Sequence, residues 1–234
     1  MLSGLPFYIP LLFIFTTLVT FLFFIAAVKK NNSNKRVAMV SLIIIIWMAL
    51  HAILGLSRFY TVTNTMPPRF ALMVAPAFLF ILILFITQSG RKFIDSLSMK
   101  ILTQLHVVRV FVEVILWWLF LYKYIPRLMT FEGRNFDIIA GITAPLITYF
   151  GFIKRRLSNT FMVIWNVICL LLLINIVVNA VLSAPFPFQQ FALDQPNVAV
   201  LYFPFVWLPS FIVPIILFSH LVLIRRLLKK EITG

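Results

Sequence analysis

The sequence predicts an all-α fold, namely a polytopic membrane protein whose single domain, residues 1–234, is a bundle of seven transmembrane helices. Three observations lead to this prediction. Hydrophobic residues make up 62% of the chain, charged residues make up 11%, and the mean hydropathy is +1.07. Because a soluble domain contains about a quarter charged residues, this much apolar surface requires lipid around it. The apolar residues also form long runs, and the cations cluster between these runs.

Seven runs approach the length of about 20 apolar residues that a helix needs to cross a bilayer. In chain order the predicted spans are 6–28, 37–57, 70–88, 99–122, 136–153, 159–183 and 201–224. Strands of a membrane barrel would alternate in polarity over about ten residues. Runs such as LIIIIWMAL and VICLLLLINIVV do not alternate, so helices are predicted instead.

The individual spans carry their own signals. The first run, 6–28, lacks a positively charged start and a small-residue cleavage site, so we interpret it as a retained span. Several later spans contain prolines, which break the helical hydrogen-bond ladder and produce either packing kinks or bends that open a cavity. These prolines are Pro76, Pro145, Pro209 and Pro214. Span 159–183 adds polar asparagines, expected to bond between helices or to line a pocket; they are Asn166, Asn175 and Asn179.

The cations predict an orientation. Fourteen Lys and Arg residues fall in the loops and tail on one side of the predicted bundle, and five fall on the other. Because cytoplasmic loops are enriched in Lys and Arg, the amino terminus is expected outside and the carboxyl terminus in the cytoplasm. The net charge of +14 is therefore interpreted as a topology signal and not as a nucleic-acid-binding face.

Span 99–122 contains the segment LHVVRVFVEV, in which three residues can carry charge. At about 100° per residue, His106, Arg109, Glu113 and Trp117 share one helix face. Each ionisable group at bilayer depth costs roughly 2.5–3.5 kcal/mol, so this face must meet protein or water. Arg109 and Glu113 can pair four residues apart. Because the cation-first order is the weaker one, a partner on another helix is expected as well.

A second polar face lies in span 37–57 and just beyond it, where Trp47, His51 and Arg58 align. We expect His51 and Arg58 to line the outer approach to the same cavity. A buried, hydrogen-bonded histidine is the alternative. The outer loops also carry acids and cations that balance in sign, as a salt-bridged cap or as the entrance of a pocket. They are Glu132, Asp137, Asp194, Arg58, Arg69 and Arg134.

Metal and cofactor sites find little support in the sequence. Cys169 is the single cysteine, which excludes a disulfide or a cysteine metal site within the chain. His106 and His220 are predicted at similar depth, so haem ligation is an alternative, although no CxxCH motif is present. His51 is expected at another depth, which disfavours a three-histidine zinc site. Span 201–224 has no lysine for a retinal Schiff base.

Hydrolase, kinase, nucleotide-binding and calcium-binding signatures are also missing from the sequence. We therefore predict no catalytic residue, no metal and no cofactor, and we favour a protein that is not an enzyme. The expected partners are the lipid bilayer and a small molecule or ion, with no nucleic acid. The oligomeric state does not follow from the sequence.

The segments MTFEGRNFDIIAGITAPL and DQPNVAVLYFPFVWLPSF resemble a family of uncharacterised bacterial integral membrane proteins with seven spans. The likeness extends along most of the chain and includes LHVVRVFVE. It implies a multi-pass protein of the bacterial inner membrane. It implies no activity, ligand or functional residue.

The sequence thus predicts a membrane protein that binds a small molecule or ion between its helices, as a transporter or a receptor-like protein. Arg109 would anchor an anion, Glu113 would accept a proton or cation, and His106 would relay protons. One alternative is an intramembrane enzyme or haem redox protein using His106 and His220. Another is a structural or assembly protein without a ligand.

Overall fold

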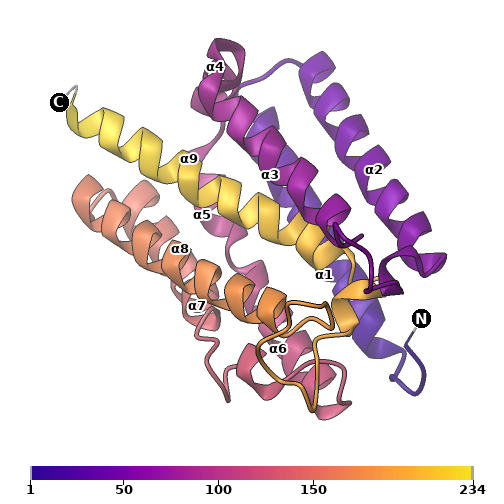
Figure 1. Ribbon diagram of the computed structural model, residues 1–234. Helices are drawn as coiled ribbons and strands as arrows, with labels where there is room; N and C mark the ends of the chain where they lie inside the picture. Colours follow the sequence, from indigo (N-terminus) through magenta and orange to yellow (C-terminus); the bar gives the residue numbers. More distant parts are fainter. Residues whose placement is uncertain (1, 233–234) are drawn as a thin grey trace.

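The structure, a computed structural model, describes residues 2–232 and contains helices but no strand in that range. The all-α prediction is confirmed, and Figure 1 shows the helices gathered into one bundle. The longer helices are α1 (Tyr8–Lys29), α2 (Asn34–Leu56), α3 (Ala71–Ile86), α4 (Gln88–Ser96), α5 (Met99–Leu105), α6 (Val108–Leu121), α7 (Ile138–Ile147), α8 (Asn159–Leu182) and α9 (Val213–Ile232). Short turns are η1 (Phe59–Thr61), η2 (Arg127–Met129) and η4 (Ala199–Leu201), and two π-helical segments are η3 (Thr148–Ile153) and η5 (Leu208–Ile212).

Five helical segments of the described chain are long and apolar enough to cross a membrane. They are Tyr8–Lys29, Asn34–Leu56, Met99–Leu121, Asn159–Leu182 and Leu208–Lys229. A sixth candidate consists of α3 and α4 together, which meet at an angle of 93°. The segment Ile138–Ile153 is apolar but shorter. Five to six membrane-crossing segments are therefore present by length and composition, and each of the seven predicted spans falls on helix.

The bend between α3 and α4 follows from local capping. Thr87 is extended, at φ −84° and ψ 149°, and its hydroxyl accepts a hydrogen bond from the Gly90 N–H at 3.1 Å. A Cβ atom on Gly90 would lie 2.2 Å from the Leu84 carbonyl oxygen, so only glycine permits the tight approach. The predicted span 70–88 consequently ends at Ile86, and α4 turns away from the axis of α3.

Span 99–122 is also not one continuous helix. Around His106 the backbone bonds connect residues three apart, with the His106 N–H donating to Thr103 at 3.3 Å and the Val107 N–H donating to Gln104 at 3.1 Å. This tight turn separates α5 from α6. Neither proline nor glycine occurs there, so nothing in the local sequence explains the break. His106 therefore lies in a turn, and the face it was predicted to share with Arg109 is interrupted.

Helix α9 lies across the middle of the bundle and packs against α8, α5 and α3 (Figure 1). Helix α6 packs against α1 on one side and α7 on the other. The contact with α7 is close because of Gly141, where an added Cβ would lie 2.7 Å from Val110 Cγ2 and 2.9 Å from the Val110 backbone nitrogen. Asp137 precedes Gly141 by four residues, so this packing brings it beside the start of α6.

Two tryptophans connect α2 to the start of the last span. Pro214 has no N–H, so the carbonyl of Ser210 lacks its usual helical donor. Trp47 Nε1 donates to that carbonyl at 2.8 Å, and Trp207 Nε1 donates to the Met48 carbonyl at 2.9 Å. The helix disruption that proline predicts is therefore compensated by a neighbouring helix.

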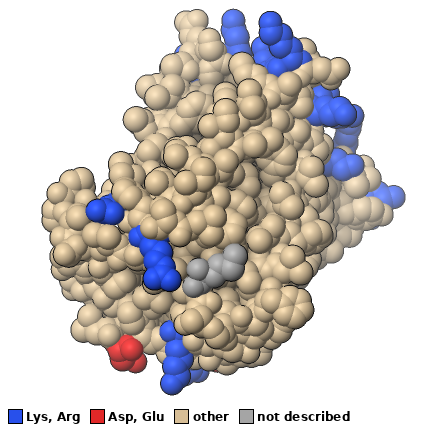
Figure 2. All heavy atoms as spheres, turned by 90° about the vertical axis from the view of Figure 1, so that its right-hand side faces the viewer, with Lys and Arg blue, Asp and Glu red and all other residues tan. Residues whose placement is uncertain are grey.

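Several predicted cationic loops meet at one end of the molecule, which lies toward the top of Figure 2. There Asp95 of α4 pairs with Lys229 at 3.1 Å and with Arg225 at 3.6 Å, both from α9. Arg226 donates to the Leu97 carbonyl, and Asn31 of the α1–α2 loop donates to the Ser96 carbonyl at 2.9 Å. These contacts place the ends of α1, α4 and α9 at the same level.

Candidate functional site

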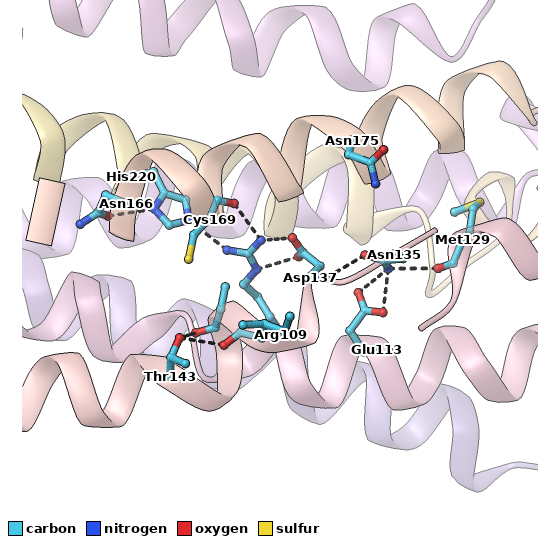
Figure 3. A network of polar contacts seen from close by, with 12 residues as sticks. Arg109, Glu113, Met129, Asn135, Asp137, Thr143, Asn166, Cys169, Asn175 and His220 are labelled. Atoms are coloured by element: carbon cyan, nitrogen blue, oxygen red, sulfur yellow. Dashed lines mark hydrogen bonds and ion pairs between the residues drawn. The ribbon is translucent and has the colours of Figure 1, made fainter. Parts of the chain in front are cut away.

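The centre of the bundle contains a buried ion pair between Arg109 and Asp137. Arg109 lies in the first turn of α6 and is 1% exposed, and Asp137 lies immediately before α7 and is 5% exposed. The Arg109 Nε donates to Asp137 Oδ2 at 2.6 Å, and Nη2 donates to Oδ1. The two side chains thus form a bidentate ion pair, the usual geometry between a guanidinium and a carboxylate (Figure 3).

The same guanidinium reaches two further helices. Arg109 Nη2 donates to the Cys169 carbonyl of α8 at 3.2 Å, and Nη1 lies 2.9 Å from His220 Nε2 of α9. Because a guanidinium only donates, His220 Nε2 must be the acceptor and its proton must be on Nδ1. That proton matches the contact of 2.9 Å between Nδ1 and Asn166 Oδ1. Arg109 therefore connects α6, α7, α8 and α9.

His106 lies beside this network without joining it through hydrogen bonds. Its ring stacks on the ring of His220 with centroids 3.9 Å apart and planes inclined by 16°. The edge of Trp165 lies against it, with centroids 5.9 Å apart. Both ring nitrogens of His106 are buried and have no hydrogen-bond partner among residues 2–232.

Glu113 is held by the loop that precedes α7. Asn135 Nδ2 lies 2.7 Å from each Glu113 carboxylate oxygen and 3.0 Å from the Met129 carbonyl. Asn135 Oδ1 accepts from the Asp137 backbone N–H at 3.0 Å. One amide side chain therefore positions both Glu113 and the segment that carries Asp137, and Figure 3 shows Asn135 joined by dashed lines to both residues.

A cavity of about 80 Å³ adjoins this network. Its ionisable lining residues are Arg109, Glu113 and Asp137. The remaining wall is mostly apolar and includes Phe70, Phe78, Leu173, Val177, Ile212 and Ile216. Because a water molecule needs roughly 10–15 Å³ by this measure, the cavity has room for several waters or for a small organic group.

The cavity is not sealed on all sides. Val74 and Phe78 of α3 and Val177 and Val181 of α8 line it, and all four are partly exposed at the surface of the bundle. The cavity is therefore not fully enclosed, and two apolar helices contribute partly exposed residues to its wall.

The structure separates the six predicted site residues into two groups. Arg109 and Glu113 line the cavity, and His106 lies beside the network. Arg109 does not pair with Glu113, however, because its ion pair is with Asp137. Trp117, His51 and Arg58 are outside the cavity wall. Trp117 is directed instead to the loop before α7, where its Nε1 donates to Glu132 Oε1 at 2.7 Å.

His51 belongs to a separate polar cluster. Its Nδ1 lies 2.6 Å from the Tyr60 hydroxyl, and its ring meets the edge of Trp47 with centroids 4.2 Å apart. Burial raises the pKa of Tyr60 to about 12 because the phenolate would lose its hydration. Arg58 is exposed and has a left-handed backbone, with φ 58°. The alternative of a buried, hydrogen-bonded His51 describes this geometry better than a shared cavity does.

The sequence predicted Asp137 in an outer loop, as part of a salt-bridged cap or of a pocket entrance, whereas the structure places it in the buried ion pair with Arg109. Its signal was position: Asp137 immediately precedes an apolar helix, and Arg109 is the sole cation within the apolar runs. Asn135, which holds Glu113, carried no comparable signal, because an asparagine in the loop MTFEGRNFD is ordinary.

The two histidines do not form a haem site in this arrangement. Their rings lie face to face 3.9 Å apart, which leaves no space for a macrocycle between them. Both nitrogens of His220 are also engaged, with Arg109 and Asn166. Among residues 2–232 no group of three or more His, Cys, Asp or Glu side chains is arranged to hold a metal ion.

Comparison with known proteins identifies one family. Its sequence model, a domain of unknown function named DUF8737, matches residues 72–228, which contain every member of the central network. No curated protein and no solved structure matches the chain. The resemblance to an uncharacterised family is therefore confirmed, and the chain belongs to the DUF8737 family.

Proposed function

We propose that this protein binds a small molecule or ion in the central cavity, within the membrane, as a transporter or a receptor-like protein. The observation that carries the proposal is the cavity of about 80 Å³ whose wall includes Arg109, Glu113 and Asp137. Ionisable residues at bilayer depth are expensive, and where they occur they commonly mark ligand or ion pathways.

Interrupted helices around the network support the same proposal. The α5–α6 break, and the π-helical segment η5 that lines the cavity, lie close to Arg109 or to the cavity wall. Membrane transporters commonly build their sites from broken helices near the middle of the bilayer, and π-helical turns frequently accompany functional sites.

The contacts change the role expected for Arg109. Its guanidinium already holds a carboxylate, a backbone carbonyl and a histidine nitrogen, which leaves little capacity for an anionic ligand. We therefore assign Arg109 to positioning the network, and we assign ligand contact to Glu113, which lines the cavity and is hydrogen-bonded by one amide group.

The proposal includes a membrane arrangement. We propose seven spans, with the short segment Ile138–Ile153 and the bent α3 each crossing the bilayer. The amino terminus is outside and the carboxyl terminus is in the cytoplasm of a bacterial inner membrane. The supporting observations are the alternation of cation-rich loops and the shared level of the Asp95, Leu97 and Ser96 contacts.

Cysteine accessibility tests the cavity. Cys169 is the single cysteine, so Cys169→Ser gives a background without thiols. Leu116 lines the cavity and is 3% exposed, whereas its neighbour Ile115 is 1% exposed and does not line it. We expect methyl methanethiosulfonate to modify Leu116→Cys at least tenfold faster than Ile115→Cys in the purified, folded protein, as measured by mass spectrometry.

The two positions are matched in burial and helix, so a difference in rate reports access through the cavity. Equal slow rates at both positions, with both variants folded by circular dichroism, would contradict the binding function. They would favour the alternative of a structural protein in which the network only joins helices.

A further inference from the structure

The charges that face the cavity do not balance. Arg109 and Asp137 neutralise each other through their ion pair. Glu113 makes no ion pair within 4.0 Å among residues 2–232, and its hydrogen-bond donor is the neutral Asn135 amide. Arg109 attracts Glu113 from one helical turn away, but its contacts are with other groups. An ionised Glu113 therefore leaves the cavity with one uncompensated negative charge.

A buried carboxylate without a counter-charge is strongly unfavourable, so the site must take up a proton or a cation. No other element that the structure describes supplies that cation. The cavity-lining residues of α3, α8, η5 and α9 are all uncharged. The missing positive charge must consequently come from outside the chain, either as a proton on Glu113 or as a bound cation.

The character of the wall favours an organic cation over a metal ion. Calcium requires six to eight oxygen ligands, and magnesium requires six. The cavity offers few oxygens beyond the Glu113 and Asp137 carboxylates. Phe70 and Phe78 line it as well, and aromatic rings attract ammonium groups. A wall of this kind suits a cation with a hydrocarbon part.

We propose that the cavity binds an alkylammonium ion, with the ammonium group at Glu113 and the alkyl group against the apolar wall between α3 and α8. The partly exposed residues Val74, Phe78 and Val177 line the opening through which such a ligand enters from the lipid side. This inference rests on the proposed binding function and names the ligand class for the same site.

The test uses three probes of nearly equal size and different charge: n-butylammonium, n-butanol and butyrate. Each is added to Leu116→Cys in the Cys169→Ser background, and the rate of modification by methyl methanethiosulfonate is measured. We expect n-butylammonium to slow the reaction at least tenfold at a concentration at which n-butanol and butyrate have less than a twofold effect.

Three further variants test whether Glu113 carries the charge that the ammonium group contacts. Glu113→Gln is expected to lose the preference for n-butylammonium, with protection measured relative to the rate of that same variant without probes. Glu132→Gln removes an exposed carboxylate of the outer loop and is expected to keep that preference. Glu113→Asp, which retains the charge, provides a second variant if Glu113→Gln does not fold.

The outcomes separate this inference from the function on which it rests. If Leu116→Cys does not react without probes, the cavity is closed and the binding function itself is overturned. If it reacts and the three probes protect equally, or butyrate protects best, the cavity remains and the alkylammonium assignment is overturned. Protection by n-butylammonium that persists in Glu113→Gln also overturns it.

Discussion

At the scale of single residues, the structure depends most on one guanidinium. Arg109 is the bulkiest of the fully buried side chains, and it contacts groups on three other helices. Desolvating an arginine is costly, and the cost is offset only while its carboxylate partner and remaining acceptors are in place. We therefore expect the loss of Asp137 to lower the free energy of unfolding strongly.

We predict that Asp137→Asn lowers the free energy of unfolding by about 3–5 kcal/mol, because it leaves the Arg109 charge buried and unpaired. The double variant Arg109→Met with Asp137→Leu removes both charges and should be more stable than Asp137→Asn. Equilibrium unfolding in mixed micelles of dodecyl sulfate and dodecyl maltoside measures both values.

Asp95→Asn is the matched control for this prediction. Asp95 also pairs with basic side chains, but its own side chain is 40% exposed. Exposed ion pairs contribute at most about 1 kcal/mol, so the control should change stability by no more than that. If Asp137→Asn behaves like Asp95→Asn, the central ion pair does not stabilise the bundle.

The sequence predicted these residues only in part. Arg109 and Glu113 were found because charge inside an apolar run is conspicuous. Their partners were not found, because Asp137 and Asn135 lie in a polar loop where such residues are common. The expected Arg109–Glu113 pair is replaced because Gly141 allows α7 to approach the backbone of α6, which is a tertiary contact that helix periodicity cannot reveal.

At the scale of elements, the helices that surround the cavity are interrupted, and neighbouring groups satisfy the backbone where they break. The clearest case is η5 with α9, where Pro214 frees the Ser210 carbonyl and Trp47 of α2 donates to it at 2.8 Å. This hydrogen bond is one of the few polar contacts between α2 and the rest of the bundle.

We predict that Trp47→Phe lowers the free energy of unfolding by about 1–3 kcal/mol, because the Ser210 carbonyl is left without a donor. In a Pro214→Ala background the restored N–H can bond that carbonyl, so Trp47→Phe should cost less there. A double-mutant cycle in detergent measures the difference, expected at about 0.5 kcal/mol or more. Additive effects would show that the tryptophan stabilises the protein only through packing.

Hydropathy located the helices well and their ends less well. Each predicted span falls on helix because the apolar runs are long and Ser, Thr and Gly separate several of them. The bend at Thr87 and the break at His106 were not predicted. The bend at Thr87 depends on the close approach of Gly90 to Leu84. The break at His106 contains no proline or glycine from which it could be predicted.

At the scale of the whole molecule, positively charged residues gather at one end of the bundle. The cationic ends of α1, α4 and α9 are joined by hydrogen bonds and ion pairs at one level. Cationic loops remain on the cytoplasmic side of a membrane, so this end should face the cytoplasm. The seven proposed spans, an odd number, would then place the two termini on opposite sides.

We predict that a green fluorescent protein fused to the carboxyl terminus is fluorescent in bacterial cells, because it stays in the cytoplasm. Alkaline phosphatase fused at the same point should be inactive, and fused at the amino terminus behind an export signal it should be active. Whole-cell fluorescence and phosphatase activity measure these outcomes. Both termini reporting the same side would require an even number of spans and would contradict the proposed topology.

Helix α2 is little embedded for its length, since Met48, His51 and Gly55 are its only buried residues and all three lie in its second half. The part from Val37 through Ile46 has no buried residue, so in the proposed membrane arrangement its main neighbours would be the hydrocarbon chains of the lipid. Solubilisation replaces those chains with detergent, so this stretch is the part of the fold whose order depends on the choice of amphiphile.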